Sequence, residues 1–176
     1  METSPGRRKL PAIVGSLIFL VIAPGTLAGY VPWAISRWRM LPPFLGFVPL
    51  RYLGIFLICL GAPVLLDSFT RFALQGLGTP APIFPPNRLI VFGWYRYVRN
   101  PMYVAVTSLI LGQASLLGDV RVLEYAAVVW LGFHIFVLVY EEPVLREQFG
   151  EDYQRFCAAV PRWLPRVTPW RGGSSS

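Results

Sequence analysis

Residues 99–142 read RNPMYVAVTSLILGQASLLGDVRVLEYAAVVWLGFHIFVLVYEE, and this stretch decides the fold. Two apolar segments, 102–117 and 122–140, lie on either side of a short polar turn. At 1.5 Å per residue these segments would form helices of roughly 24 Å and 28 Å, compared with a hydrocarbon core of about 30 Å. The turn is too short for anything but an antiparallel pair. We therefore predict a helical hairpin that crosses a membrane.

Charged and polar residues stand at both outer ends of this hairpin. Asn100 is a good helix cap and Pro101 is tolerated in the first turn, so the first helix is expected to begin here. The hairpin then returns the chain to the same membrane face. Arg99 is predicted to meet Glu141 and Glu142 there, and we interpret that meeting point as the site.

Composition places the whole chain in the membrane class. Its 176 residues have a mean hydropathy of +0.52, with 55% hydrophobic and 14% charged residues. The net charge is +7, but the basic residues flank apolar runs instead of forming a stripe, which favours anionic lipid headgroups over nucleic acid. Cys59 and Cys157 lie in different kinds of segment, so neither a disulfide nor a metal site is expected.

Two further apolar runs precede the hairpin, at residues 10–35 and 44–69. We therefore predict an all-α, polytopic bundle of about four spans in a single domain, residues 1–171, with 172–176 as a flexible tail or expression remnant. A loop at 73–98 and an amphipathic segment at 141–160 complete the domain; the apolar positions of that segment are Leu145, Phe149, Tyr153 and Phe156. Twelve of the sixteen basic residues fall on one side, so both termini are predicted to be cytoplasmic.

The predicted cytoplasmic face combines a glycine-rich loop, an arginine, a tyrosine and two carboxylates. Gly76 and Gly78 allow close approach of backbone to a ligand, and Tyr103 follows Arg99 by one helical turn. This set suits a ligand that carries a carboxylate, an ammonium or sulfonium group, and ribose hydroxyls. S-adenosylmethionine has all of these groups, but a nucleotide or an anionic lipid would fit nearly as well.

Two other ionisable residues have two interpretations each. Asp67 precedes Arg71 by four residues, which indicates a helix-end ion pair and leaves a catalytic role as the alternative. His134 is the single histidine of the sequence and lies in an apolar segment. It is either a satisfied interhelical hydrogen bonder or part of the lining of a cofactor cavity or substrate tunnel.

The order of these motifs resembles that of a known group of membrane enzymes. RNPMY, an apolar hairpin and EEPVLREQFGEDYQRFCAAVPRWLP are similar to the motifs of the isoprenylcysteine carboxyl methyltransferase and phospholipid methyltransferase superfamily, over roughly residues 76–165. The resemblance implies cofactor-binding roles at Gly76, Gly78, Arg99, Asn100, Pro101, Tyr103, Glu141 and Glu142, and catalytic roles at Arg162, Tyr103 and Asn100. The family usually has His where this chain has Asn100, which cannot act as a general base near neutral pH.

The resemblance implies an S-adenosylmethionine-dependent enzyme that methylates a lipophilic or prenylated acceptor at the cytoplasmic face, with membrane lipids as further partners. Because Asn100 supplies no base, we favour a carboxylate acceptor, as in isoprenylcysteine carboxyl methylation. Phospholipid N-methylation is the alternative within the class. A non-enzymatic lipid-binding or transport protein is the alternative from another class. The oligomeric state is left open by the sequence.

Overall fold

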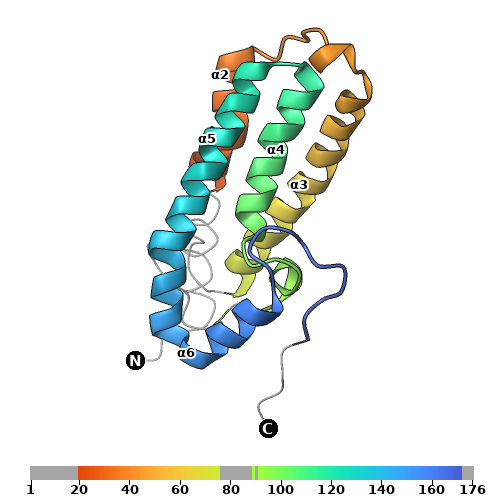
Figure 1. Cartoon of the computed structure of the whole chain (residues 1–176). Helices are drawn as coiled ribbons and strands as arrows, with labels where there is room; N and C mark the ends of the chain where they lie inside the picture. Colours follow the sequence, from red (N-terminus) through yellow and green to blue (C-terminus); the bar gives the residue numbers. More distant parts are fainter. Residues whose placement is uncertain (1–19, 76–88, 90, 172–176) are drawn as a thin grey trace.

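The computed structural model describes residues 20–75, 89 and 91–171, and all regular secondary structure within them is helical. The all-α prediction is thereby confirmed for this part of the chain. The helices lie side by side along one direction, and α6 turns across one end of the bundle (Figure 1). The principal elements are Leu20–Ser36, which ends in α2 (Val31–Ser36), then α3 (Pro49–Gln75), α4 (Pro101–Leu117), α5 (Val120–Phe136) and α6 (Glu142–Ala159).

Helices α3 and α4 form the closest pair in the bundle, and glycines allow their backbones to approach. A Cβ added at Gly54 would lie 2.6 Å from the carbonyl oxygen of Gly112, and one at Gly112 would lie 2.8 Å from that of Gly54. A Cβ added at Gly61 would lie 3.0 Å from the carbonyl oxygen of Ala105. Small residues at such contacts are typical of helix packing in membranes, where association depends on van der Waals contact.

The predicted turn at Gly118 and Asp119 is present between α4 and α5. Gly118 adopts a left-handed conformation (φ 70°), and a Cβ there would lie 2.2 Å from the carbonyl oxygen of Pro42. The carboxylate of Asp119 caps α5 by accepting a hydrogen bond from the backbone N–H of Arg121 at 3.0 Å. The backbone N–H of Leu41 donates to the carbonyl oxygen of Leu117 at 2.8 Å, which joins the hairpin turn to the loop that precedes α3.

Replacing Asp119 by Ala is expected to lower the free energy of unfolding by about 1–2 kcal/mol, because the cap of α5 is lost. Hydrogen bonds from Arg121 hold the pKa of Asp119 below its usual value. Its contribution is therefore present above the unfolded-state pKa of about 4 and disappears as the pH falls through the lower folded-state pKa. Thermal denaturation in detergent across pH measures both effects. The exposed Asp152→Ala variant is the control, and equal losses in the two variants would contradict the capping role.

A π-turn, η1 (Thr26–Tyr30), interrupts the first described helix and leaves carbonyl groups without their usual helical partners. Side chains from the hairpin satisfy two of them. Gln113 donates to the carbonyl oxygen of Ala28 at 2.6 Å, and Tyr125 donates to that of Leu27 at 3.0 Å. These bonds attach the first helix to α4 and α5 in an otherwise apolar region.

The element bounds differ from several of the predicted ones. The second span was predicted from residue 44, but residues 44–46 form a separate 3₁₀ turn with Leu45 in a left-handed conformation (φ 53°), and α3 begins at Pro49. Helix α3 also continues past residue 69 to Gln75, because Asp67 pairs with Arg71 and no Gly or Pro interrupts this part. The predicted loop at 73–98 is therefore helical at its start, while its residues 76–88 and 90 lie outside the described residues.

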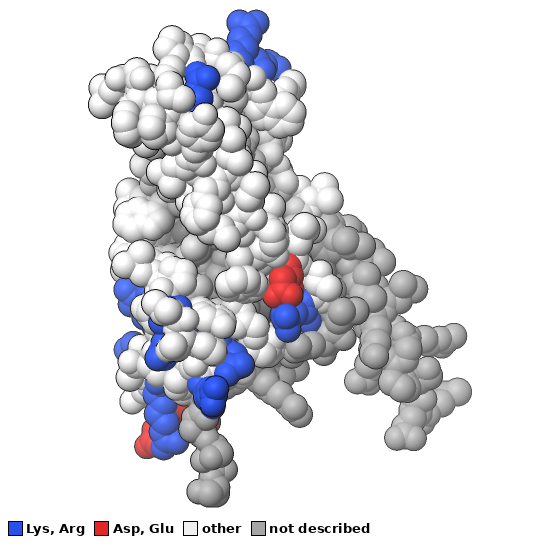
Figure 2. Space-filling model, turned by 90° about the vertical axis from the view of Figure 1, so that its right-hand side faces the viewer, with Lys and Arg blue, Asp and Glu red and all other residues white. Residues whose placement is uncertain are grey.

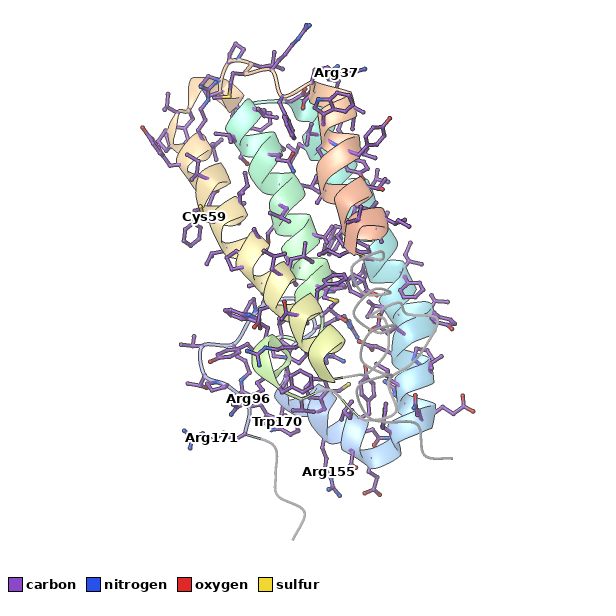
Figure 3. The ribbon with its side chains drawn as sticks, turned by 180° about the vertical axis from the view of Figure 1, so that it is seen from behind. Arg37, Cys59, Arg96, Arg155, Trp170 and Arg171 are labelled. Atoms are coloured by element: carbon purple, nitrogen blue, oxygen red, sulfur yellow. The ribbon has the colours of Figure 1, made fainter. Side chains whose placement is uncertain are left out.

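Among the residues that the structure describes, two helices are long and apolar enough to cross a membrane, Pro49–Arg71 and Val120–Ala159. Leu20–Ser36 and Pro101–Leu117 are shorter apolar helices, so four spans remain a prediction. Uncharged side chains cover most of the upper part of the face shown in Figure 2, with charged groups at its ends. Arg37 lies at one end of the bundle, and Arg96, Arg155 and Arg171 lie at the other (Figure 3).

Candidate functional site

Glu142 is the centre of a cluster of charged side chains at the end of the bundle where α4 begins and α6 starts. Its carboxylate accepts two hydrogen bonds from Arg162, Nε to Oε1 at 2.6 Å and Nη2 to Oε2 at 3.0 Å. Arg99 donates a third from Nη1 to Oε1 at 3.0 Å. The Glu142 side chain is only 8% exposed, so this carboxylate is held by two cations away from solvent. The hydrogen bonds to Glu142 raise the pKa of Arg162.

Arg162 reaches Glu142 because the chain after α6 turns back along the start of α4. Pro161 follows the extended residue Val160 that ends α6, and its carbonyl oxygen accepts from the backbone N–H of Arg99 at 2.9 Å. The side-chain amide of Asn100 donates to the carbonyl oxygen of Arg162 at 3.2 Å. Asn100 occupies the cap position of α4 but makes no side-chain cap bond. Its amide instead secures the segment that carries Arg162.

The second carboxylate has a different environment. Glu141 accepts a hydrogen bond from the phenol of Tyr103 at 2.9 Å, and the ring of Tyr103 packs on Phe133 with centroids 4.6 Å apart. Tyr95, in the 3₁₀ turn η3 (Gly93–Arg96), lies near the same carboxylate; burial, followed by the charge of Glu141, raises the pKa of Tyr95. The two adjacent glutamates thus have separate partners, arginines for one and tyrosines for the other.

A π-turn sets the directions of these glutamates. The turn η4 (Val137–Glu141) connects α5 to α6 without ending the helix, so the backbone is helical from Val120 to Ala159. The extra residue in a π-turn changes the angular position of everything after it, and such turns are frequent at functional sites. The prediction that the apolar helix ends near residue 140 is therefore wrong for the backbone, although the apolar sequence does end there.

The segment after Glu142 packs over this end of the bundle. Gly150 bends α6 with a positive φ of 50°, and Tyr153, Phe156 and Val160 form a small buried core with Leu89 and Val91 around it. Trp170 and Arg96 exchange two hydrogen bonds, at 2.9 Å and 2.7 Å, which fixes the C-terminal segment. Through Leu89 and Val91 the amphipathic segment therefore packs against the end of the predicted loop 73–98.

Sequence reasoning missed Cys157 as a member of the cluster. Its sulfur accepts a hydrogen bond from Nη1 of Arg99 at 2.8 Å, and the same nitrogen donates to Glu142. Cys157 follows Tyr153 by four residues, so its helical spacing from the apolar face was a signal that could have found it. The Nε of Arg99 is buried and makes no hydrogen bond within the described part of the chain.

The remaining predicted site residues lie in different places. Pro101 is buried at the start of α4. Asp67 forms an ion pair with Arg71 at 2.7 Å, as the simpler interpretation predicted. His134 accepts a hydrogen bond from the indole N–H of Trp163 at 3.0 Å. Gly76 and Gly78 lie outside the described residues.

Comparison with known proteins gives this arrangement a family. The family model described as phospholipid methyltransferase matches residues 50–152, more than half of the chain. The chain belongs to this family. The matched residues include Arg99, α4, α5 and both glutamates, whereas Arg162 lies beyond the match.

A curated relative extends the comparison. Over 80 residues the chain is 35% identical to the protein-S-isoprenylcysteine O-methyltransferase of Schizosaccharomyces pombe (strain 972 / ATCC 24843). This alignment covers 45% of the present chain and 34% of the relative. The chain thus spans about a third of the length of this relative. Together the two matches establish the superfamily indicated by the sequence motifs.

Proposed function

We propose that this chain is an S-adenosylmethionine-dependent methyltransferase that methylates the carboxylate of a lipophilic acceptor at a membrane face. The observation that carries the proposal is the cluster of Arg99, Glu142 and Arg162, placed beside Glu141 and Tyr103 at one end of an apolar bundle. Family membership favours methyl transfer, and the name of the relative favours a prenylated cysteine acceptor.

The described residues fit the proposed cofactor. Arg99 retains a buried Nε donor without a partner in the described residues, which suits an anionic group such as a carboxylate. Glu141 has acceptor capacity beyond its bond to Tyr103, which suits an ammonium or a ribose hydroxyl. When bound, S-adenosylmethionine supplies an electrophilic methyl group. Gly76 and Gly78 remain candidates for backbone contacts to it.

The protein's own contribution is mainly to position the reacting groups and exclude water. An acceptor carboxylate is already nucleophilic and requires no proton removal. Asn100 cannot remove a proton, and its amide is engaged with the carbonyl oxygen of Arg162. Arg162 would orient an anionic acceptor, while the α6 segment covers the site. These roles make carboxylate methylation the function that this arrangement supports best.

Phospholipid N-methylation is the second candidate, favoured by the description of the matching family. An amine acceptor must lose a proton, and Glu141 is the carboxylate not already paired with an arginine among the described contacts. A non-enzymatic lipid-binding or transport role has less support, because anchoring to anionic lipid does not call for two buried or half-buried glutamates at a helix junction.

The orientation and domain assignment belong to the same proposal. We place the site end, with Arg96, Arg155 and Arg171, on the cytoplasmic side, opposite the end with Arg37 (Figure 3). The termini would then be cytoplasmic and residues 1–171 would form one methyltransferase domain. The lipophilic acceptor would enter from the bilayer.

Calorimetric titration of the detergent-purified protein with S-adenosylmethionine and S-adenosylhomocysteine tests the cofactor. We expect micromolar binding that Glu141→Gln or Glu142→Gln weakens at least about tenfold, which corresponds to about 1.4 kcal/mol. The exposed Glu151→Gln variant is the matched control, because Glu151 pairs only with Arg155 among the described ion pairs. Folded protein that binds neither compound would rule out the proposal. Turnover with a farnesylated cysteine but not with phosphatidylethanolamine then distinguishes the two acceptors.

A further inference from the structure

Three aromatic side chains attach the C-terminal segment to α5, and neither the sequence motifs nor the proposed chemistry accounts for them. The indole N–H of Trp163 donates to Nδ1 of His134 at 3.0 Å. Trp130, one turn before His134, stacks on the imidazole with centroids 5.2 Å apart and planes at 17°. Trp130 and Trp163 also contact each other, with centroids 6.4 Å apart. We call these three residues the aromatic cluster.

The cluster is placed where it can control the site, because Trp163 is the residue after Arg162. The side chains of Trp163 and Arg162 bind two different residues of the helical segment formed by α5, η4 and α6. Trp163 contacts His134, and Arg162 contacts Glu142. Eight residues separate these points, roughly 12 Å along a helix. Asn100 fixes the backbone between Arg162 and Trp163, because its amide donates to the carbonyl oxygen of Arg162.

The hydrogen bond specifies the state of the imidazole. His134 accepts through Nδ1, so the proton of the neutral ring is on Nε2. The half-buried indole of Trp163 has its single donor directed at this acceptor. Loss of the acceptor would leave that donor unsatisfied and remove the directional contact that fixes Trp163, while the stacking of the rings alone is less specific in orientation.

We propose that His134 and Trp163 are positioning residues that hold Arg162 in its two-point contact with Glu142, and this inference rests on the proposed methyltransferase function. The bond sets the path of the C-terminal segment, and the segment sets the direction of the Arg162 guanidinium. His134 acts through Arg162 and does not touch the reacting groups. The Trp163→Phe change removes the donor and keeps a smaller aromatic ring, His134→Leu removes the acceptor, and His134→Asn retains an acceptor near the position of Nδ1.

The test measures how accessible Cys157 is, independently of activity. The readout is the rate at which a maleimide modifies Cys157 in a Cys59→Ser background. Cys157 lies against Arg99 in the charged cluster, so a displaced C-terminal segment should expose it. Trp163→Phe and His134→Leu are each expected to accelerate labelling about tenfold, the double variant no further, and His134→Asn much less. Trp33→Phe, in α2 and outside the site, is the matched control and should label like the parent.

Turnover of a farnesylated cysteine in the same variants gives the second readout. The expected result is a fall in kcat of about tenfold in Trp163→Phe and His134→Leu, with KM for the acceptor nearly unchanged and recovery in His134→Asn. Additive labelling effects in the double variant, or equal damage from His134→Asn and His134→Leu, would overturn the positioning role. If the parent shows no turnover, the proposed function fails, whereas the labelling rates still decide whether the pair holds the segment.

Discussion

Replacing Arg162 by Lys is expected to reduce kcat/KM for methyl transfer at least about a hundredfold, a loss of about 2.7 kcal/mol in transition-state stabilisation. The guanidinium of Arg162 contacts both oxygens of Glu142, at 2.6 Å and 3.0 Å. A lysine ammonium keeps the charge but cannot reproduce this planar two-point contact. The orientation of Glu142, and of Arg99, which donates to the same oxygen Oε1, would therefore be lost without a change in net charge. Steady-state kinetics with a farnesylated cysteine provides the measurement.

Arg155→Lys is the matched control for this substitution. Arg155 is 65% exposed and pairs with Glu151 and Asp152 on the surface of α6, where such pairs contribute little. Its kinetics should equal those of the parent. If Arg162→Lys folds and also retains the parent kcat/KM, the two-point contact with Glu142 has no part in turnover, and the arginine would need a different role.

Replacing Gly112 by Leu is expected to lower the stability of the bundle by about 3 kcal/mol, the upper end of the range for overpacking. A Cβ at Gly112 would meet the carbonyl oxygen of Gly54 at 2.8 Å and the side chain of Ile58 at 2.7 Å. Because the first of these is backbone, no change of rotamer can remove the clash, and α3 must move away from α4. Thermal denaturation and size-exclusion chromatography in detergent would detect the loss.

Gly132→Leu is the control, since a Cβ at Gly132 on α5 has no neighbour within 4 Å among the described residues. Both substitutions replace an intrinsically poor helix former by a good one, so their difference isolates the packing term. Gly132→Leu should match or exceed the parent in stability. Equal unfolding temperatures for the two variants would show that close contact between α3 and α4 does not limit stability.

The hairpin and part of the site could be predicted because both follow from local pattern. Apolar lengths and a short polar turn define two antiparallel helices, and antiparallel geometry brings Arg99 to Glu142. The sequence motifs also placed Tyr103 near the glutamates, and the structure has its phenol 2.9 Å from Glu141. The end of α3 was less predictable, because charged residues do not stop a helix where no Gly or Pro follows them, as in residues 70–75.

Long-range contacts set the rest of the site and have no local signature. The bond from Asn100 to the carbonyl oxygen of Arg162 joins residues 62 positions apart, so propensity favoured the incorrect idea of a side-chain cap. The contact of Cys157 with Arg99 depends equally on how α6 folds over the bundle. The π-turn η4 was also not predictable, because it begins with the apolar residues 137–139, which continue the pattern of the helix before it.

The π-turn η4 makes the packing of α5 independent of the direction in which Glu142 points, whereas in one regular α-helix the two would be linked. Helix α5, before it, packs against α4, whereas Glu142, directly after it, contacts Arg99 and Arg162. In a regular α-helix each residue advances the rotation by about 100°, so deleting one residue from the turn would rotate the glutamates away from their partners while leaving the phase of α5 intact. Substitutions on α5 can consequently change how this helix packs with no change in the direction in which Glu142 points.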